Sequence, residues 1–304
     1  MTPERRAIQL MIGQAVLFAA ETAVIHQIGS RMSVMQIALI RGAAGLALAL
    51  LLARQIGFAV VRTRQLPLQI VRGAVSAAYL WVMIYSFGHL PFADATAISY
   101  TQAAYIALFS VLILGEAVGR WRWTAAAVGI FGALLVAKPE FGGGAAAYLV
   151  AIVGTSLNGL SFVLNRYLQR EDSETTTMFY SSLVPALANA PVLLVAGLPS
   201  PETLAWLPAL ALLGPVGLYF GIVAVKHASA AMLGPYTLLR LVIALAVGVL
   251  IFRERPDAFS FLGAALIIAS CLVSTWSGGL RRRPFVGGRG SLMPAAVLVR
   301  AQPR

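Results

Sequence analysis

The chain has 304 residues, of which 59% are hydrophobic and 11% are charged, and its formal net charge is +12. Because a soluble domain carries about 25% charged residues, this composition excludes an ordinary soluble fold and predicts a membrane protein. The positive charges fall in short segments between apolar runs. Membrane topology therefore accounts for them, and we expect no nucleic-acid partner. The lone cysteine, Cys271, cannot form an intrachain disulfide.

Apolar runs long enough to cross a hydrocarbon core about 30 Å thick recur along the chain. They are too long for the strands of a membrane barrel, and they do not alternate polar with apolar residues. We therefore predict an all-α polytopic fold with ten transmembrane helices. The predicted spans are residues 8–28, 34–53, 67–88, 94–114, 122–138, 146–168, 177–197, 205–225, 229–252 and 258–277.

Ten spans place both termini on one side of the membrane, and the basic residues predict which side. With cytoplasmic termini, the outside segments hold Arg31, Lys138, Arg253 and Arg255. The inside segments then hold a larger set, namely Arg5, Arg6, Arg54, Arg62, Arg64, Arg120, Arg122, Arg166, Arg170, Lys226 and the arginines of the tail. This asymmetry predicts an inner-membrane protein with both termini in the cytoplasm. Residues 280–304 mix Arg with Gly and Pro and are expected to form a disordered basic tail.

The chain contains an internal repeat. When the sequence is shifted against itself by 138 residues, 105–132 falls in register with 243–270. The matched pairs are Glu116 with Glu254, Trp121 with Phe259, Trp123 with Phe261, Ala125 with Gly263 and Gly132 with Ser270. The small residues of the last two pairs stand seven positions apart on one helical face, where they let another backbone come close. Five helices followed by five similar ones must run in opposite senses across the bilayer, as in many secondary transporters. We expect two repeats, 1–140 and 141–279, although apolar segments rich in Ala, Leu and Gly can also resemble one another by composition.

Two groups of motifs resemble a known family. They are "LPFADATAISYTQAAYIALFSVLILGE" (90–116) with "GIFGALLVAKP" (129–139), and "FRE" (252–254) with "GAALIIAS" (263–270). Over roughly residues 8–277 the chain resembles the EamA-type transporters of the drug/metabolite transporter superfamily. The resemblance implies two inverted five-helix halves and no enzymatic activity. Members export amino acids and related metabolites, or import compounds such as riboflavin or S-adenosylmethionine. The chain departs from the family pattern in lacking a Trp-Gly pair near Glu21 and in carrying Ser270 where a second Gly is customary.

Three ionisable residues lie well within the predicted spans: Glu21, Arg41 and Arg240. A charge at the centre of a span costs roughly 2.5–3.5 kcal/mol, so such a residue normally faces a partner or a cavity. Glu21 and Arg41 stand ten residues either side of Arg31, in the predicted outside turn, which places them at similar depth. Two interpretations stay open. Either they form a structural ion pair, or Glu21 exchanges a proton or binds a cationic part of the substrate while Arg41 is released.

Arg240 stands near the predicted midplane of its span, where the other half of the repeat has Gln102. A charge that is present in one half alone suits recognition of a particular solute. We therefore expect Arg240 to meet either Glu21 or an anionic group of the substrate. Glu116 and Glu254 occur in both halves at span ends, and we predict that they are scaffold residues.

Aromatic and amide side chains at that depth suit a small organic metabolite better than a bare ion. The predicted substrate-binding residues are Arg240, Gln102, Trp81, Tyr105, Asn158 and Tyr219. Tyrosines and tryptophans near span ends commonly mark the membrane interface instead, but Trp81, Tyr105 and Tyr219 lie deeper. The three histidines lack a metal-binding spacing, and no metal or cofactor is expected.

The sequence thus predicts a secondary transporter that moves a small amino-acid-like, zwitterionic or anionic solute by alternating access, with proton coupling as one option. An intramembrane enzyme is an alternative, because Ser156 and Asn158 lie in one span, but no histidine matches their depth. A channel or scaffold is another, although the chain shows neither a ring of charges nor a filter loop. The expected partners are the solute and the lipid bilayer, and a homodimer is left open.

Overall fold

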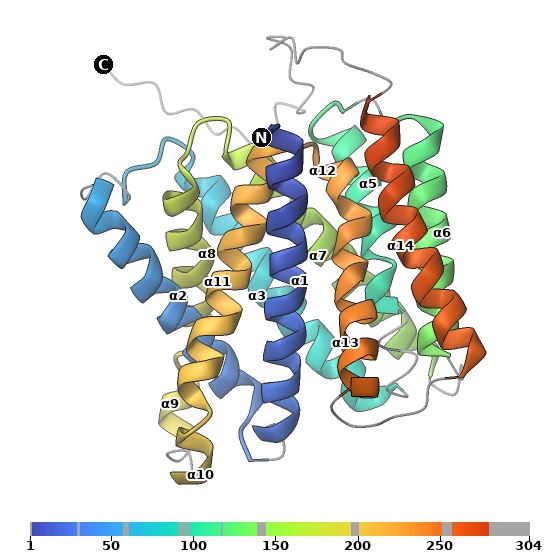
Figure 1. Cartoon of the computed structure of the whole chain (residues 1–304). Helices are drawn as coiled ribbons and strands as arrows, with labels where there is room; N and C mark the ends of the chain where they lie inside the picture. Colours follow the sequence, from blue (N-terminus) through green and yellow to red (C-terminus); the bar gives the residue numbers. More distant parts are fainter. Residues whose placement is uncertain are drawn as a thin grey trace.

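A computed structural model gives the architecture of the chain (Figure 1). It describes residues 2–28, 31–56, 61–90, 95, 98–116, 118–138, 144–195, 201–250 and 257–279. The regular structure in these ranges is helical. Seven of the described helical segments are long and apolar enough to cross a membrane. The chain is therefore an all-α polytopic membrane protein, as its composition predicts. The tail 280–304 lies outside the described residues.

The helices reproduce the ten predicted spans. Those of the first half are α1 (Pro3–Ile28), α2 (Val34–Ile56), α3 (Leu66–His89), α5 (Gln102–Leu112) and α6 (Arg120–Ala137). Those of the second half are α7 (Ala145–Leu168), α8 (Glu174–Asn189) with α9 (Val192–Val195), α10 (Pro201–Leu204) with α11 (Leu207–His227), α12 (Ala230–Leu233) with the 3₁₀ segment η2 (Gly234–Leu238) and α13 (Leu239–Leu250), and α14 (Ala258–Gly279).

Prolines decide where two of these spans are interrupted. Helix α8 ends at Asn189, two residues before Pro191, because proline lacks the N–H that would continue the α-helical hydrogen bonds. At Gly234–Pro235 the helix changes to the tighter 3₁₀ form, since proline lacks the N–H that would continue the α-helical hydrogen bonds. Pro185 and Pro215, in contrast, lie inside continuous helices. The break at Pro235 shapes the segment that carries Arg240.

The helix packing has the two-fold pattern of an inverted repeat. In such a repeat α1 corresponds to α7, α2 to α8, α3 to α11 and α6 to α14. Helix α6 packs most extensively on its counterpart α14, and α2 on its counterpart α8. Helix α1 packs on α11 and α3 on α7, two contacts that the same rotation interchanges. In Figure 1, α1 begins and α14 ends at one end of the bundle, which we call the terminal face; the other end is the far face.

Small residues let α6 and α14 approach closely, as the repeat predicts. A Cβ added at Gly132 would lie 2.6 Å from the carbonyl oxygen of Gly263, and one added at Gly129 would lie 2.7 Å from Ser270 Oγ. No side chain fits between backbones at such a distance. These positions include Gly132, Gly263 and Ser270, which the sequence placed on the packing faces of the two helices.

Polar contacts hold the helix ends. Glu116 Oε2 accepts a hydrogen bond of 3.3 Å from the amide of Ala231 in α12, and burial raises the pKa of Glu116 although that bond opposes the rise. Its predicted counterpart Glu254 lies outside the described residues. At the far face, hydrogen bonds from Lys138 and then Ser260 lower the pKa of Asp257 to about 2. The stability that this carboxylate adds is present above its ordinary pKa of 3.8 and is lost as the pH falls toward 2.

Candidate functional site

A cavity of about 380 Å³ lies where the two halves meet. Its wall is formed by residues of α1, α2, α3, α5, α7, α8, α11, η2 and α13 and by residues 99 and 100. Its polar lining comes from side chains on eight of these elements and on the helical residues 98–100: Gln14, Glu21, Thr22, Arg41, Arg72, Ser76, Tyr79, Ser99, Tyr100, Gln102, Asn158, Ser161, Asn165, Ser181, Ser182, Tyr236, Thr237 and Arg240. Phe18 and Phe162 add aromatic surface. A space of this size and lining fits a small organic molecule.

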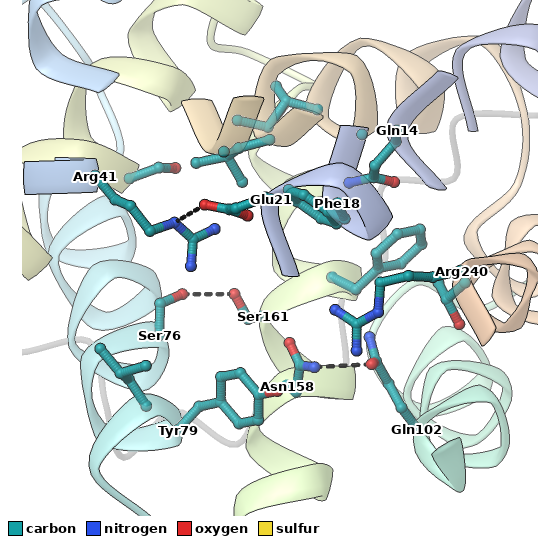
Figure 2. Close-up of a pocket in the computed structure, with 18 of the residues that line it drawn as sticks. Gln14, Phe18, Glu21, Arg41, Ser76, Tyr79, Gln102, Asn158, Ser161 and Arg240 are labelled. Atoms are coloured by element: carbon teal, nitrogen blue, oxygen red, sulfur yellow. Dashed lines mark hydrogen bonds and ion pairs between the residues drawn. The ribbon is translucent and has the colours of Figure 1, made fainter. Parts of the chain in front are cut away.

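Glu21 and Arg41 form an ion pair in the cavity wall, with 2.7 Å between Glu21 Oε1 and Arg41 Nε (Figure 2). The Glu21 side chain is 5% exposed and that of Arg41 is 34% exposed. The contact is electrostatic rather than a regular hydrogen bond, because Oε1 has no hydrogen-bond donor of acceptable geometry among the described residues. The pairing of α1 with α2 at this depth is the one that their spacing around Arg31 predicts.

A glycine of α11 makes room for this pair. A Cβ added at Gly214 would collide with the Glu21 carboxylate and would lie 2.8 Å from Arg41 Nε. The helix backbone therefore borders the ion pair directly. This close approach brings a second-half helix against two first-half side chains, so the pair lies at the interface of the repeats.

Arg240 reaches into the same cavity from α13. It is half-buried, and it lines the cavity wall. Its guanidinium lies against the phenol of Tyr100 and near that of Tyr79, and it is close enough to Glu21 for electrostatic attraction. Among the described ion pairs, none includes Arg240. Glu21 is thus attracted to two arginines, and of these it forms an ion pair with Arg41 (Figure 2).

Two hydrogen bonds join the halves across the cavity. Asn158 Nδ2 on α7 donates to Gln102 Oε1 on α5 at 2.8 Å, beside the Arg240 guanidinium (Figure 2). Ser76 Oγ on α3 and Ser161 Oγ on α7 are 2.8 Å apart. The predicted residues Gln102, Asn158 and Arg240 therefore come together, with Gln102 close to the residue that it matches in the repeat.

Three predicted binding residues lie outside the cavity lining. Trp81 is 44% exposed and donates to Asn189 Oδ1 at 3.3 Å. It stands two residues after Tyr79, which is about 200° around a helix, and so it faces away. Tyr105 packs against α7 at Gly159, and Tyr219 packs beside Met178 in an apolar cluster. Depth in the membrane predicted these residues, but the direction in which each faces depends on the packing of its helix.

One charged residue of the cavity wall, Arg72, was not predicted from the sequence. Arg72 on α3 lines the cavity and is 3% exposed. It is the seventh residue of its helix, so its position alone suggested an interfacial charge. The informative signal is the polar spacing Gln69, Arg72, Ser76 and Tyr79, which falls on one helical face. A polar face inside a membrane helix indicates a cavity rather than lipid.

The described residues contain no cluster of three or more His, Cys, Asp and Glu side chains that could hold a metal ion. Comparison with known proteins shows the family of the chain. The EamA-like transporter family matches residues 5–138 and again 145–276. The chain belongs to the EamA-like transporter family. The two matches, one in each half, together cover nearly the whole helical part of the chain.

Relatives of this EamA-like chain are named as transporters. It is 28% identical over 272 residues to the pseudopaline exporter CntI of Pseudomonas aeruginosa (strain UCBPP-PA14), with 88% of this chain and 95% of that protein covered. It is 31% identical over 222 residues to the riboflavin transporter of Rhizobium johnstonii, with 72% and 73% covered. It is 27% identical over 218 residues to the S-adenosylmethionine uptake transporter of Rickettsia prowazekii, with 71% and 74% covered.

A solved crystal structure has the same fold. It superposes with a TM-score of 0.79 at 17% identity and covers 91% of this chain and 99% of its own. The family match and the named relatives make the chain a multi-pass inner-membrane transporter and not an enzyme.

Proposed function

We propose that the chain is a secondary transporter of a small amino-acid-like solute, zwitterionic or anionic, and that it works by alternating access. The observation that carries this proposal is the charge of the central cavity. Of the described residues, three arginines and one glutamate line it. A wall with excess positive charge favours a solute that brings negative charge. Both export and import occur among the named relatives, so the proposal leaves the direction of transport open.

Arg240 is the proposed carboxylate-binding residue. Its guanidinium is planar and presents several donors, which suits a carboxylate held at two points. Tyr79 and Tyr100 border this arginine, and the Gln102–Asn158 pair offers amide groups for the polar remainder of the solute. Arg240 has no ion-pair partner among the described residues, which leaves its charge available to the solute.

Glu21 is the proposed proton-coupling residue. It is attracted to both Arg41 and Arg240, so an anion that engages Arg240 competes for the positive charge on which Glu21 depends. A proton taken up by Glu21 would compensate for that competition and would leave Arg41 free to turn toward the solute. Binding of proton and anion would then be linked, which is what proton coupling requires.

The fold supports alternating access and a cytoplasmic location of the terminal face. The basic residues of the terminal face outnumber those of the far face, as the positive-inside rule demands of a cytoplasmic side. The pairs α6–α14 and α2–α8 each join two helices that correspond in the repeat. If one half rocks against the other about such a two-fold axis, a central site opens to each side of the membrane in turn.

The proposal is tested with purified protein in detergent. Thermal unfolding is followed against amino acids, vitamins and organic anions, and hits are tested for counterflow in proteoliposomes. We expect an anionic or zwitterionic hit whose stabilisation disappears in Arg240→Gln. The matched control is Arg54→Gln, because Arg54 is exposed on α2 outside the cavity.

Replacing the ligand-binding charge should lower affinity by about tenfold or more, since hydrogen bonds to charged groups contribute about 1.5–3 kcal/mol. Saturable counterflow separates a carrier from a channel. Unchanged binding and counterflow in a folded Arg240→Gln variant would remove Arg240 from the site.

A further inference from the structure

Arg72 is a buried charge with no charged partner among the described residues. Its surface is 3% exposed, its Nε atom makes no hydrogen bond, and no described ion pair includes it. A buried guanidinium without a counter-charge is unfavourable, so a charged group that binds and leaves is the expected compensation. Arg72 lines the central cavity, where such a group can reach it.

The acid that α3 does contact is engaged by other residues. Gln69, one turn before Arg72, is fully buried and donates from Nε2 to Asp172 Oδ2 at 2.7 Å. Thr63 Oγ1 donates to the same oxygen at 2.6 Å. Asp172 therefore ties the start of α3 to the turn between α7 and α8. Among the described residues that line the cavity, the acid is Glu21, and it pairs with Arg41.

A second unsatisfied polar group lies on the facing helix at the same level. Ser76 and Ser161 are hydrogen-bonded between α3 and α7. These helices run in opposite directions, so the turn before Ser76 lies opposite the turn after Ser161. That register brings Asn165 level with Arg72. Asn165 lines the cavity, is 6% exposed, and its Oδ1 atom makes no hydrogen bond with the described residues.

The cavity therefore has charge for two anionic groups. Of its three lining arginines, Arg41 is neutralised by Glu21, which leaves Arg72 and Arg240. Arg72 stands six residues from the start of α3, about 9 Å below the terminal face. Arg240 stands ten residues from the start of α12, about 17 Å below the same face, because the 3₁₀ residues in that segment rise about 2.0 Å each. The two arginines are thus staggered along the direction of transport.

We propose that Arg72 and Asn165 form a second anion-binding subsite, and that the solute carries two anionic groups, one bound at Arg240 and the other at Arg72. This inference rests on the proposed function, because it places both groups in one transport cavity. Arg72 supplies the charge, and Asn165 accepts a hydrogen bond from a donor next to the second anionic group.

Dicarboxylates of increasing length test the subsite and measure its distance from Arg240. The probes are succinate, glutarate and adipate, each compared with the monocarboxylate of the same carbon number (butyrate, valerate and hexanoate). Affinities come from thermal unfolding of the purified full chain at constant ionic strength. We expect the wild-type protein to prefer at least one diacid over its matched monoacid by about tenfold or more.

The variants assign that preference to Arg72. In Arg72→Gln the diacid should bind no better than the monoacid, whose own affinity is unchanged. In Arg240→Gln both should weaken, and in Arg54→Gln neither should change. Arg72→Met serves as a second variant of similar length. Because Arg72 has no counter-charge, both replacements should unfold at the wild-type temperature or higher when no anion is present.

Three results would overturn the subsite. They are equal binding of diacids and monoacids by the wild-type protein, a diacid preference that survives in Arg72→Gln or Arg72→Met, or loss of folding in both variants, which would mean that Arg72 has a structural partner. Anion binding that is insensitive to Arg240 would instead contradict the proposed function. The two failures are therefore distinguishable.

Discussion

At Gly214 the backbone of α11 borders the Glu21–Arg41 ion pair with no side chain between them. The pair is buried on the carboxylate side and partly exposed to the cavity on the arginine side. That asymmetry matters, because a fully buried pair would be a permanent packing element. An arginine that keeps a third of its surface free can leave the carboxylate and return. The geometry therefore suits a reversible pair as well as a structural one.

A double-mutant cycle separates these two roles. Removing one partner of a buried pair typically costs about 3–5 kcal/mol; because Arg41 is partly exposed, we expect about 1–3 kcal/mol for Glu21→Gln. Glu21→Gln with Arg41→Gln should recover most of that stability, measured by thermal unfolding. Glu171→Gln, an exposed carboxylate, is the control.

Transport is the second readout of the cycle. If Glu21 couples protons, both Glu21 variants lose the dependence of transport on a pH gradient even where stability is restored. Proton-dependent transport in the stable double variant would assign a purely structural role to the pair.

Residue identity was more predictable than side-chain direction. Glu21, Arg41 and Arg240 could be singled out because each is a charged residue in an apolar span, where its charge needs a partner or a cavity. Whether Trp81 or Tyr79 faces the cavity depends on the rotation of α3 about its own axis. The depth of a residue in its span does not determine that rotation.

At the scale of helices, α6 and α14 form a tightly packed pair apart from the cavity. In their contact the carbonyl oxygen of Gly263 on α14 lies so close to Gly132 on α6 that no side chain fits between them. These two helices correspond in the repeat, so their contact relates one half to the other. The repeat in the sequence predicted the small residues of this contact, because both copies keep them seven positions apart.

A methyl group in this contact should be destabilising. Gly132→Ala would place a Cβ 2.6 Å from a backbone oxygen, which cannot move aside as a flexible side chain can. We expect a loss of about 1–3 kcal/mol, the usual range for overpacking, measured as a lower unfolding temperature. The control is Gly119→Ala, where nothing lies within 4 Å of the added carbon. A Gly132→Ala protein as stable as that control would contradict the packing described for α6 and α14.

At the scale of the molecule, the ten spans and the inversion of the halves followed from span length, span number and the internal repeat. The interruptions at Pro191 and Pro235 could be placed at prolines, but the change to 3₁₀ geometry depends on the packing around them. Arg72 shows the limit of such reasoning. Its distance from the helix start predicts an interfacial charge, but Arg72 is 3% exposed, on a helix that packs against α7 and α8.

The central claim is that one cavity opens to both sides of the membrane in turn. The chain has one cysteine, Cys271, so Cys271→Ser gives a background free of thiols. In that background Ser76→Cys places a thiol in the cavity wall, and Ser270→Cys places one in the buried α6–α14 contact as a control. Membrane-impermeant thiol reagents are then applied to sealed vesicles of each orientation.

We predict that Ser76→Cys is labelled from both sides, that a transported solute lowers the labelling, and that Ser270→Cys is labelled from neither. Labelling of Ser76→Cys from one side alone, with or without solute, would contradict alternating access.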